Sequence, residues 1–195
     1  MWGSVDGVER SGEPGGLSED RVGTAGALAW VLDGASSVMV TDAATDSLWV
    51  VDHLDRALRE LADHPVPLDE LVAAAIARLA ARAEREWLAT PMCPRPPRRG
   101  WCAGYWVAST DPEAAHHAVT ADVEDVDEII LATDGFMRAV ELFGLVSDLA
   151  DLFVRDLAEV ADGIREMELD DPDVRRFPRW RVHDDICALR LRWSP

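Results

Sequence analysis

In the stretch Ile129-Ile130-Leu131-Ala132-Thr133-Asp134-Gly135, an apolar run leads directly into an Asp-Gly pair. An earlier run of the same kind, residues 27–32, leads into Asp33-Gly34, and a third apolar run follows Asp184-Asp185. Short apolar runs are typical of buried strands, and Asp-Gly is typical of a sharp turn at a strand end. If these strands lie side by side, their aspartates meet at one edge of the core.

The spacing of the other apolar residues predicts helices between these strands. Five of them, from Leu48 to Leu61, recur at steps of three and four residues, which is the period of an amphipathic helix. A second helix is predicted from about residue 69 to 88, and a helical stretch from about 137 to 168. Strands are predicted at 25–33, at 105–108, before Asp134 and at 185–193, with a Pro- and Arg-rich loop at 89–100. Helices segregated from a largely antiparallel sheet indicate an α+β layered domain.

Length and composition predict a loose N-terminal lead-in over residues 1–17 and a single domain over 18–195. The formal net charge of −18 disfavours nucleic acid and anionic membranes as partners, because both carry negative charge. The three cysteines lack zinc-finger spacing, and we see neither a signal-peptide pattern nor an apolar stretch of transmembrane length. We therefore expect a cytoplasmic protein.

The aspartates at the strand ends are candidates for metal ligands. Mg²⁺ and Mn²⁺ prefer oxygen ligands, and Asp20, Asp33, Asp134 and Asp184 would supply four carboxylates. Two such ions that share one carboxylate can lower the pKa of a water, and the hydroxide can then attack a phosphorus centre. The simpler interpretation is that these aspartates only make turns, since Asp and Glu number 37 of 195 residues and Asp-Gly is a common turn dipeptide.

Four segments resemble, in the same order along the chain, motifs of the metal-dependent protein phosphatases of type 2C. They are Ser18-Glu19-Asp20, Trp30-Val31-Leu32-Asp33-Gly34-Ala35, Ile130-Leu131-Ala132-Thr133-Asp134-Gly135 and His183-Asp184-Asp185-Ile186. The resemblance implies a β-sandwich flanked by helices (α-β-β-α), here reduced in strand number. It implies hydrolysis of phosphoserine or phosphothreonine esters without a covalent phosphoenzyme.

The resemblance also implies roles for individual residues. Two Mn²⁺ or Mg²⁺ ions would be held by Asp20, Asp33, Asp134 and Asp184, with Asp33 bridging both ions and the Gly34 carbonyl binding one. Asp33 and Asp134 would be the main catalytic residues. Asp185 stands where an Asn or Asp usually follows the metal ligand.

The chain departs from this family at several points. Members usually carry an Arg five residues before the Glu-Asp aspartate to bind the substrate phosphate, and this position is Gly15; Arg21 and Arg10 are the candidates to replace it. Ala35 stands where some members have a histidine general acid. The family's further core strands, with a Gly-Asp-Ser turn, are missing between the second helix and Tyr105. Their loss would leave exposed apolar faces and unpaired strand edges.

Three functions therefore stay open. The first is a metal-dependent serine/threonine phosphatase whose substrate is a phosphoprotein or a small phosphomonoester. The second is a catalytically impaired relative that acts as a regulatory or binding module. The third is an acidic α+β domain whose aspartates only make turns. A homo-oligomer would repair an exposed sheet edge, and neither nucleic acid nor a membrane is expected as a partner.

Overall fold

A computed structural model describes residues 2–34, 44–88, 101–102, 105–106, 108 and 110–194. The chain has the predicted α+β class, with helices and small antiparallel sheets. It divides into two compact units, one of residues 1–51 with 125–195 and the other of residues 52–124. Each unit is described by itself.

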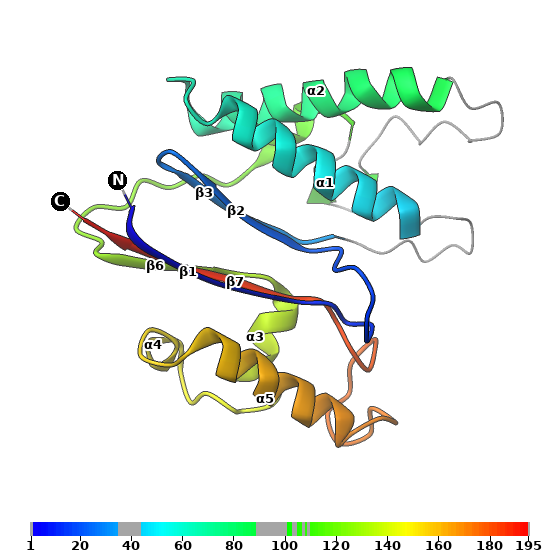
Figure 1. Ribbon diagram of the computed structural model, residues 1–195, viewed down its shortest axis with the longest axis vertical. Coiled ribbons are helices and arrows are strands. Elements are labelled where there is room, and N and C mark those ends of the chain that lie inside the picture. The colour runs from blue at the N-terminus through cyan, green and yellow to red at the C-terminus, as the bar shows by residue number, and fades with distance from the viewer. Residues whose placement is uncertain are drawn as a thin grey trace. The chain divides into compact units, whose positions relative to one another are not determined.

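A three-stranded antiparallel sheet forms the centre of the first unit, in the order β1 (Trp2–Arg10), β7 (Ile186–Trp193) and β6 (Glu128–Ala132) (Figure 1). The central strand β7 is buried at four consecutive positions from Ile186 to Leu189. This continuous burial follows from its place in the sheet, because both of its edges are paired and both of its faces are covered. The predicted strand at 185–193 is confirmed.

A two-stranded hairpin of β2 (Arg21–Ala25) and β3 (Leu28–Leu32) packs over one face of this sheet (Figure 1). Gly26, with φ +57°, makes the two-residue turn between the strands. The strand predicted at 25–33 is confirmed as β3 over residues 28–32, although it begins three residues later than expected because of this turn; strand β2 was not predicted. Trp30 is 7% exposed, and its ring lies so close to Gly23 that a Cβ there would be 2.3 Å from the ring.

Helices cover the other face of the three-stranded sheet. They are α3 (Asp134–Glu141), α4 (Leu149–Leu152) and α5 (Leu157–Leu169), and α3 and α5 pack on the sheet (Figure 1). The helices predicted over about 137–168 are confirmed, and they are three in number, since Gly144 (φ +64°) follows the first helix and Asp148 and Asp156 cap the next two. The core between helices and sheet includes Phe136, Val146, Leu157, Ile164 and Ile186.

The N-terminal residues belong to the sheet, so the prediction of a loose lead-in over residues 1–17 is wrong. Strand β1 pairs with β7 from Trp2 opposite Trp193 to Arg10 opposite Ile186. Only Val8 of β1 is buried, and the strand has little apolar pattern of its own. Strand β1 forms because its backbone is hydrogen-bonded to the apolar strand β7. The side chains of β1 alone do not indicate this pairing.

The second unit contains the end of α1 (Ala44–Leu61), all of α2 (Leu68–Leu88) and the short 3-10 helix η1 (Pro112–His117), which packs on α2. The two predicted helices are confirmed, and their apolar faces are buried at Leu54, Leu58, Leu71 and Ile76. Strand β5 (Tyr105–Trp106) lies within the strand predicted at 105–108, and it pairs with β4 (Trp101–Cys102), which was not predicted. The predicted loop at 89–100 and Ala35 lie outside the described residues.

Candidate functional site

The β2–β3 hairpin brings Asp20 and Asp33 together. Arg21 pairs with Leu32, so the residues just before β2 and just after β3 leave the same end of the hairpin. Asp20 is 3% exposed, and the backbone N–H of Gly34 donates a hydrogen bond of 3.1 Å to its Oδ1. Asp33, by contrast, is exposed. The two predicted ligands therefore lie side by side, one buried and one at the surface.

The three-stranded sheet brings Asp134 and Asp184 to one edge. Ala132 of β6 pairs with Ala188 of β7, and beyond this pair the N–H of Thr133 donates to the Cys187 carbonyl at 2.9 Å. The Cys187 N–H in turn donates to the Thr133 hydroxyl at 3.1 Å. Asp134 comes directly after Thr133, and Asp184 comes just before the first residue of β7. Because β6 and β7 are antiparallel, both aspartates lie at the same edge of the sheet.

The two pairs of aspartates influence each other electrostatically. Partial desolvation raises the pKa of Asp33, and the charges of Asp134, Asp184 and Asp185 raise it further, while the Asp134 backbone N–H lowers it. Burial likewise raises the pKa of Asp184. The positive charge of Arg138 lowers this pKa, and the negative charge of Asp134 raises it. The structure therefore gathers the predicted carboxylates at one edge, with more negative charge than the surroundings neutralise.

Asp20 is the aspartate whose ionisation is most perturbed. Burial raises the pKa of Asp20 to about 7, against the lowering effect of hydrogen bonds from the Gly34 N–H and the Thr133 side chain. The charges of Asp33 and Asp185 raise it as well. A carboxyl group with this pKa gains from a nearby cation, which would favour its charged form.

The glycines of the two Asp-Gly pairs are needed for close backbone approach. A Cβ on Gly34 would lie 2.2 Å from the Glu19 carbonyl oxygen, and one on Gly135 would lie 1.9 Å from the Asp185 carbonyl oxygen. Neither glycine has a positive φ. The close contacts explain why glycine stands at these two positions: it lets the loops that carry Asp20 and Asp184 come close to Asp33 and Asp134.

Asp185 fastens the loop between β1 and β2. Its Oδ1 accepts a hydrogen bond of 2.6 Å from the Gly12 N–H, and its Oδ2 accepts one from the Glu19 N–H. These bonds hold residues 12–19 next to the start of β7. Asp185 therefore positions Asp20, which follows Glu19 directly.

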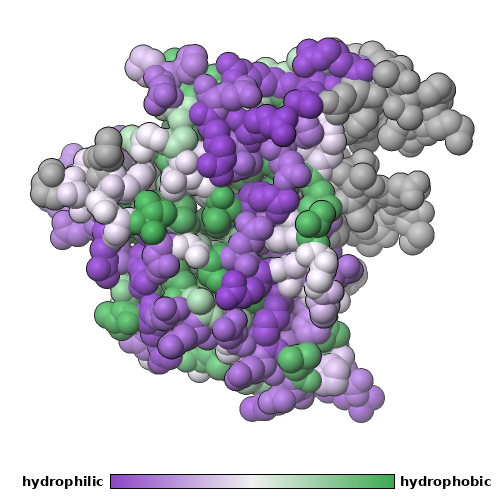
Figure 2. Space-filling model, viewed as in Figure 1, coloured by the Kyte–Doolittle hydropathy of each residue, from purple (hydrophilic) through white to green (hydrophobic). Residues whose placement is uncertain are grey.

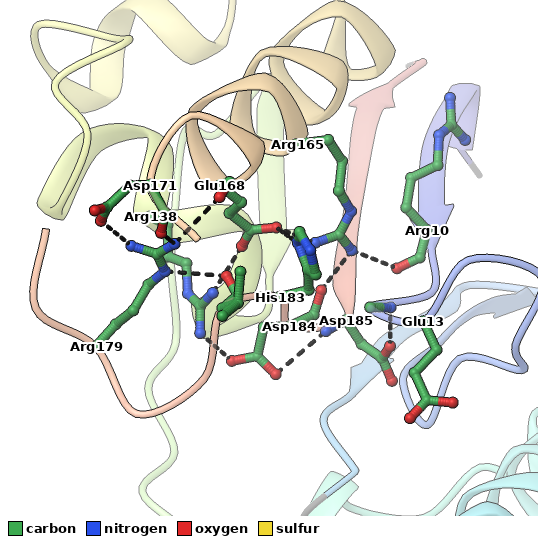
Figure 3. A network of polar contacts seen from close by, with 12 residues as sticks. Arg10, Glu13, Arg138, Arg165, Glu168, Asp171, Arg179, His183, Asp184 and Asp185 are labelled. Carbon is green, nitrogen blue, oxygen red and sulfur yellow. Dashed lines mark hydrogen bonds and ion pairs between the residues drawn. The ribbon is translucent and has the colours of Figure 1, made fainter. Parts of the chain in front are cut away.

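A group of charged side chains around the buried Glu168 contacts Asp184 (Figure 3). Glu168 of α5 is fully buried and accepts from Arg138 at 2.7 Å, from Arg165, and from His183 at 3.0 Å. Arg138 also binds the Asp184 carboxylate, and Arg165 donates to the Asp184 and Ser11 carbonyls. This network fixes the backbone and one carboxylate oxygen of Asp184.

Sequence reasoning missed this network, although it contains one detectable signal. Leu157, Ala161 and Ile164 form the buried face of α5, and Glu168 falls on the same face four residues later. A charged residue on a buried face requires partners. Arg165, three residues earlier on the same helix, is a partner that local spacing can suggest, whereas Arg138 and His183 lie 30 residues earlier and 15 residues later and are identified only by the fold.

The two arginines proposed to replace the missing phosphate-binding Arg are both engaged. Arg21 donates to the carbonyls of Ser18 and Asp20 and lies 3.6 Å from Glu9. Arg10 pairs with Asp162 at 3.5 Å, and its side chain extends away from Asp185 (Figure 3). At the family's usual position, Gly15 has φ +75°, and a Cβ on this residue would meet no described atom within 4 Å. Within the described residues, a phosphate-binding role for Arg10 or Arg21 would require breaking these contacts.

Over the parts of the chain that the structure describes, no group of three or more His, Cys, Asp or Glu side chains is close enough to hold a metal ion in its present arrangement. The gathered aspartates thus act on one another through charge, and no shared ligand cage is formed. Cys187, next to this edge, is fully buried, and burial raises the pKa of its thiol. That places it with the core residues, since a reactive cysteine needs a lowered pKa and access.

None of the described helices has the length and apolar character needed to cross a membrane. Comparison of the chain with protein-family models, with curated proteins and with solved structures finds no match.

Proposed function

We propose that this chain is a shortened relative of the type 2C phosphatases and hydrolyses phosphomonoesters with the help of Mn²⁺ or Mg²⁺. The observation that carries the proposal is the convergence of Asp33 with Asp134 and Asp184, whose charges raise its pKa. These residues come from three separate segments, and each lies in a motif that resembles the family's. Aspartates that only made turns could also meet at one edge of paired strands, so the metal dependence of the activity separates the two interpretations.

The donor set fits a hard divalent cation. All candidate ligands are oxygens, from Asp20, Asp33, Asp134 and Asp184 and the Gly34 carbonyl. Mg²⁺ usually keeps several waters and takes only one or two protein carboxylates, so a preformed cage of three side chains is not required. Burial first, and neighbouring negative charge after it, raise the pKa values of Asp20 and Asp33, and a bound cation would favour the charged form of both carboxyl groups.

When bound, the divalent cation supplies a water of lowered pKa and offsets negative charge on the phosphoryl oxygens. The chain's own residues hold the ligands in place. The Gly34 N–H and Thr133 orient Asp20, Asp185 fastens the loop that precedes it, and Arg138 orients Asp184. Asp33 and Asp134 carry the main roles because they are exposed at the edge, where a substrate phosphate can reach them.

A second candidate function is a catalytically impaired relative that acts as a regulatory or binding module. The arginine contacts favour it, because Arg138 already binds Asp184 and Arg21 is held by two carbonyls and Glu9. In either case we propose a cytoplasmic protein, with a phosphoprotein or a small phosphomonoester as the ligand of the edge. A homo-oligomer is also part of this proposal.

The test is hydrolysis of a small aryl phosphate by the purified chain with and without millimolar Mn²⁺, together with the melting temperature under the same conditions. Asp33→Ala is the test variant, and Asp162→Ala is its control. Asp162 also lies in an Asp-Gly pair, but it is exposed on α5 and pairs only with Arg10 at 3.5 Å among the described residues.

Each outcome selects one function. Mn²⁺-dependent turnover that Asp33→Ala abolishes and Asp162→Ala keeps would support the phosphatase. A melting temperature that Mn²⁺ raises, without turnover, would favour the regulatory relative, since a ligand that binds only the folded state stabilises it. Neither turnover nor stabilisation in the folded protein would leave the aspartates as turn residues and overturn the proposal.

A further inference from the structure

The second unit contains a pocket whose lining is mainly basic. It has a volume of about 270 Å³ and lies between α1 and α2. Among the described residues, four of its lining side chains are arginines: Arg56 from α1, and Arg78, Arg82 and Arg85 from α2. His53 also lines it, and Glu60 is its only acidic lining residue in the described part.

Helical spacing explains how these side chains come to share one pocket. Arg78, Arg82 and Arg85 follow one another at steps of four and three residues, so they lie on one face of α2. Arg56 and Glu60 are likewise four residues apart on α1. An ion pair of 3.0 Å between Glu60 and Arg78 joins the two helices at this point. Buried Leu79 and Ala57 form the apolar floor.

The described lining of the pocket is positively charged, whereas the chain as a whole is negatively charged. Hydrophilic side chains of both signs have the same colour in Figure 2, which shows them on one face of the molecule. Four arginines and one glutamate give the described lining a net charge of +3, whereas the whole chain carries −18. Glu60 neutralises only Arg78, while Arg82 and His53 have further contacts. Arg56 and Arg85 are exposed and form no ion pair with any described residue. Like charges at neighbouring positions of a helix face destabilise it, so this arrangement costs stability unless an anion compensates it.

The side-chain chemistry indicates which anion fits. The guanidinium group is a planar fork that binds phosphate oxygens through paired hydrogen bonds, and several forks around one point favour a compact, multiply charged group. A volume of about 270 Å³ suits a small ligand. A long polyanion such as nucleic acid would be repelled by the rest of a chain with charge −18.

We propose that the α1–α2 pocket is a binding site for a phosphoryl group, supplied by a free phosphate compound or by a phosphorylated side chain. The site does not depend on the proposed phosphatase function, because none of the aspartates of the metal edge contributes to it. Removal of divalent ions, or loss of Asp33, leaves it intact.

The experiment is calorimetric titration of the full chain at low ionic strength, with EDTA present, using inorganic pyrophosphate as the probe. The Arg56→Gln/Arg85→Gln double variant tests the pocket, and Arg155→Gln, which removes one exposed arginine of the other unit, measures the effect of losing arginine charge outside the pocket. Ala81→Glu adds a negative charge at an exposed lining position and serves as a second test variant. Melting curves of all variants verify that they are folded.

We expect saturable binding that weakens by about tenfold or more in the double variant, because each lost charged hydrogen bond costs about that factor. Binding should also weaken in Ala81→Glu, because the added carboxylate repels the phosphoryl group. Arg155→Gln and Asp33→Ala should bind like the wild type. A phosphoserine peptide and its unphosphorylated counterpart then distinguish the two sources: stronger binding than pyrophosphate identifies a phosphorylated side chain, and weaker binding a free phosphate compound. No saturable binding of pyrophosphate, or equal binding by the wild type and both pocket variants, would overturn the proposal.

Discussion

Arg138 joins the buried carboxylate of Glu168 to the carboxylate of Asp184, with a distance of 2.7 Å from its Nη1 to Glu168 Oε1. The residue thus connects helix α3, which begins at Asp134, with the segment that enters β7. One side chain therefore sets the position of one candidate metal ligand and lies four residues after another. It is also a cation fixed at an edge where negative charge accumulates.

Replacing Arg138 should destabilise the fold strongly. Arg138→Gln removes one cationic partner from Glu168, whose side chain is 0% exposed. Breaking a buried ion pair in this way costs about 3–5 kcal/mol of folding stability. Urea unfolding measures the effect. Arg175→Gln is the control, because its pair with Asp173 is 86% and 74% exposed and should contribute less than about 1 kcal/mol. Equal stabilities of the two variants would contradict the assigned role of Glu168.

The two glycines of the α3 and α5 helices should respond in opposite directions to alanine. Gly135→Ala places a Cβ 1.9 Å from the Asp185 carbonyl oxygen, and overpacking of this kind costs about 1–3 kcal/mol or more. Gly163→Ala lies within α5, where the nearest side-chain atom would be 3.5 Å away, and it should stabilise the protein by about 1 kcal/mol. Thermal unfolding of both variants measures the two changes in stability. A Gly163→Ala variant that is less stable than the wild type would contradict the prediction.

Asp185 should control the order of the loop before Asp20. In Asp185→Ala the N–H groups of Gly12 and Glu19 lose their carboxylate acceptor, which costs about 1–3 kcal/mol. Hydrogen exchange followed by NMR should show faster exchange of these two amides than in the wild type. Asp173→Ala, which removes an exposed carboxylate, should leave both amides unchanged. Unchanged exchange in Asp185→Ala would mean that other contacts hold the loop.

Asp171 should make stability depend on pH in the acid range. Its carboxylate accepts from the N–H groups of Arg175, Arg176 and Phe177 and from Arg179. These hydrogen bonds, the one from the Arg176 N–H foremost, lower the pKa of Asp171 to about 2 from an ordinary value of 3.8. A carboxyl group with a lowered pKa stabilises the fold when ionised, so its contribution is present above pH 3.8 and is lost as the pH falls toward 2.

Melting temperatures of the wild type and Asp171→Asn between about pH 5 and pH 2 test this dependence. The wild type should be the more stable protein at the upper end, and the difference should narrow as the pH falls through the range set by the two pKa values. A constant difference over the whole range would show that the Asp171 contribution does not depend on its ionisation.

The sequence predicted the elements that carry their own pattern. The apolar runs before Asp134 and after Asp185 became β6 and β7, and the two helices α1 and α2 formed where their spacing indicated. The positions of the aspartates at strand ends were also predictable, because strand ends can be read from local residue types. The first strand was missed, since its pairing with β7 leaves almost no pattern in its own side chains.

The sequence by itself therefore determined the α+β class, the apolar strands and helices, and the carboxylates at the ends of those strands. Hydrophobic periodicity and turn chemistry are local properties, and they act over a few residues. Only the tertiary structure decided which carboxylates meet, why Gly34 and Gly135 must lack side chains, and how Glu168 and Arg138 hold Asp184. These relationships join segments that are far apart in the chain, and they depend on strand register and packing, which no local pattern specifies.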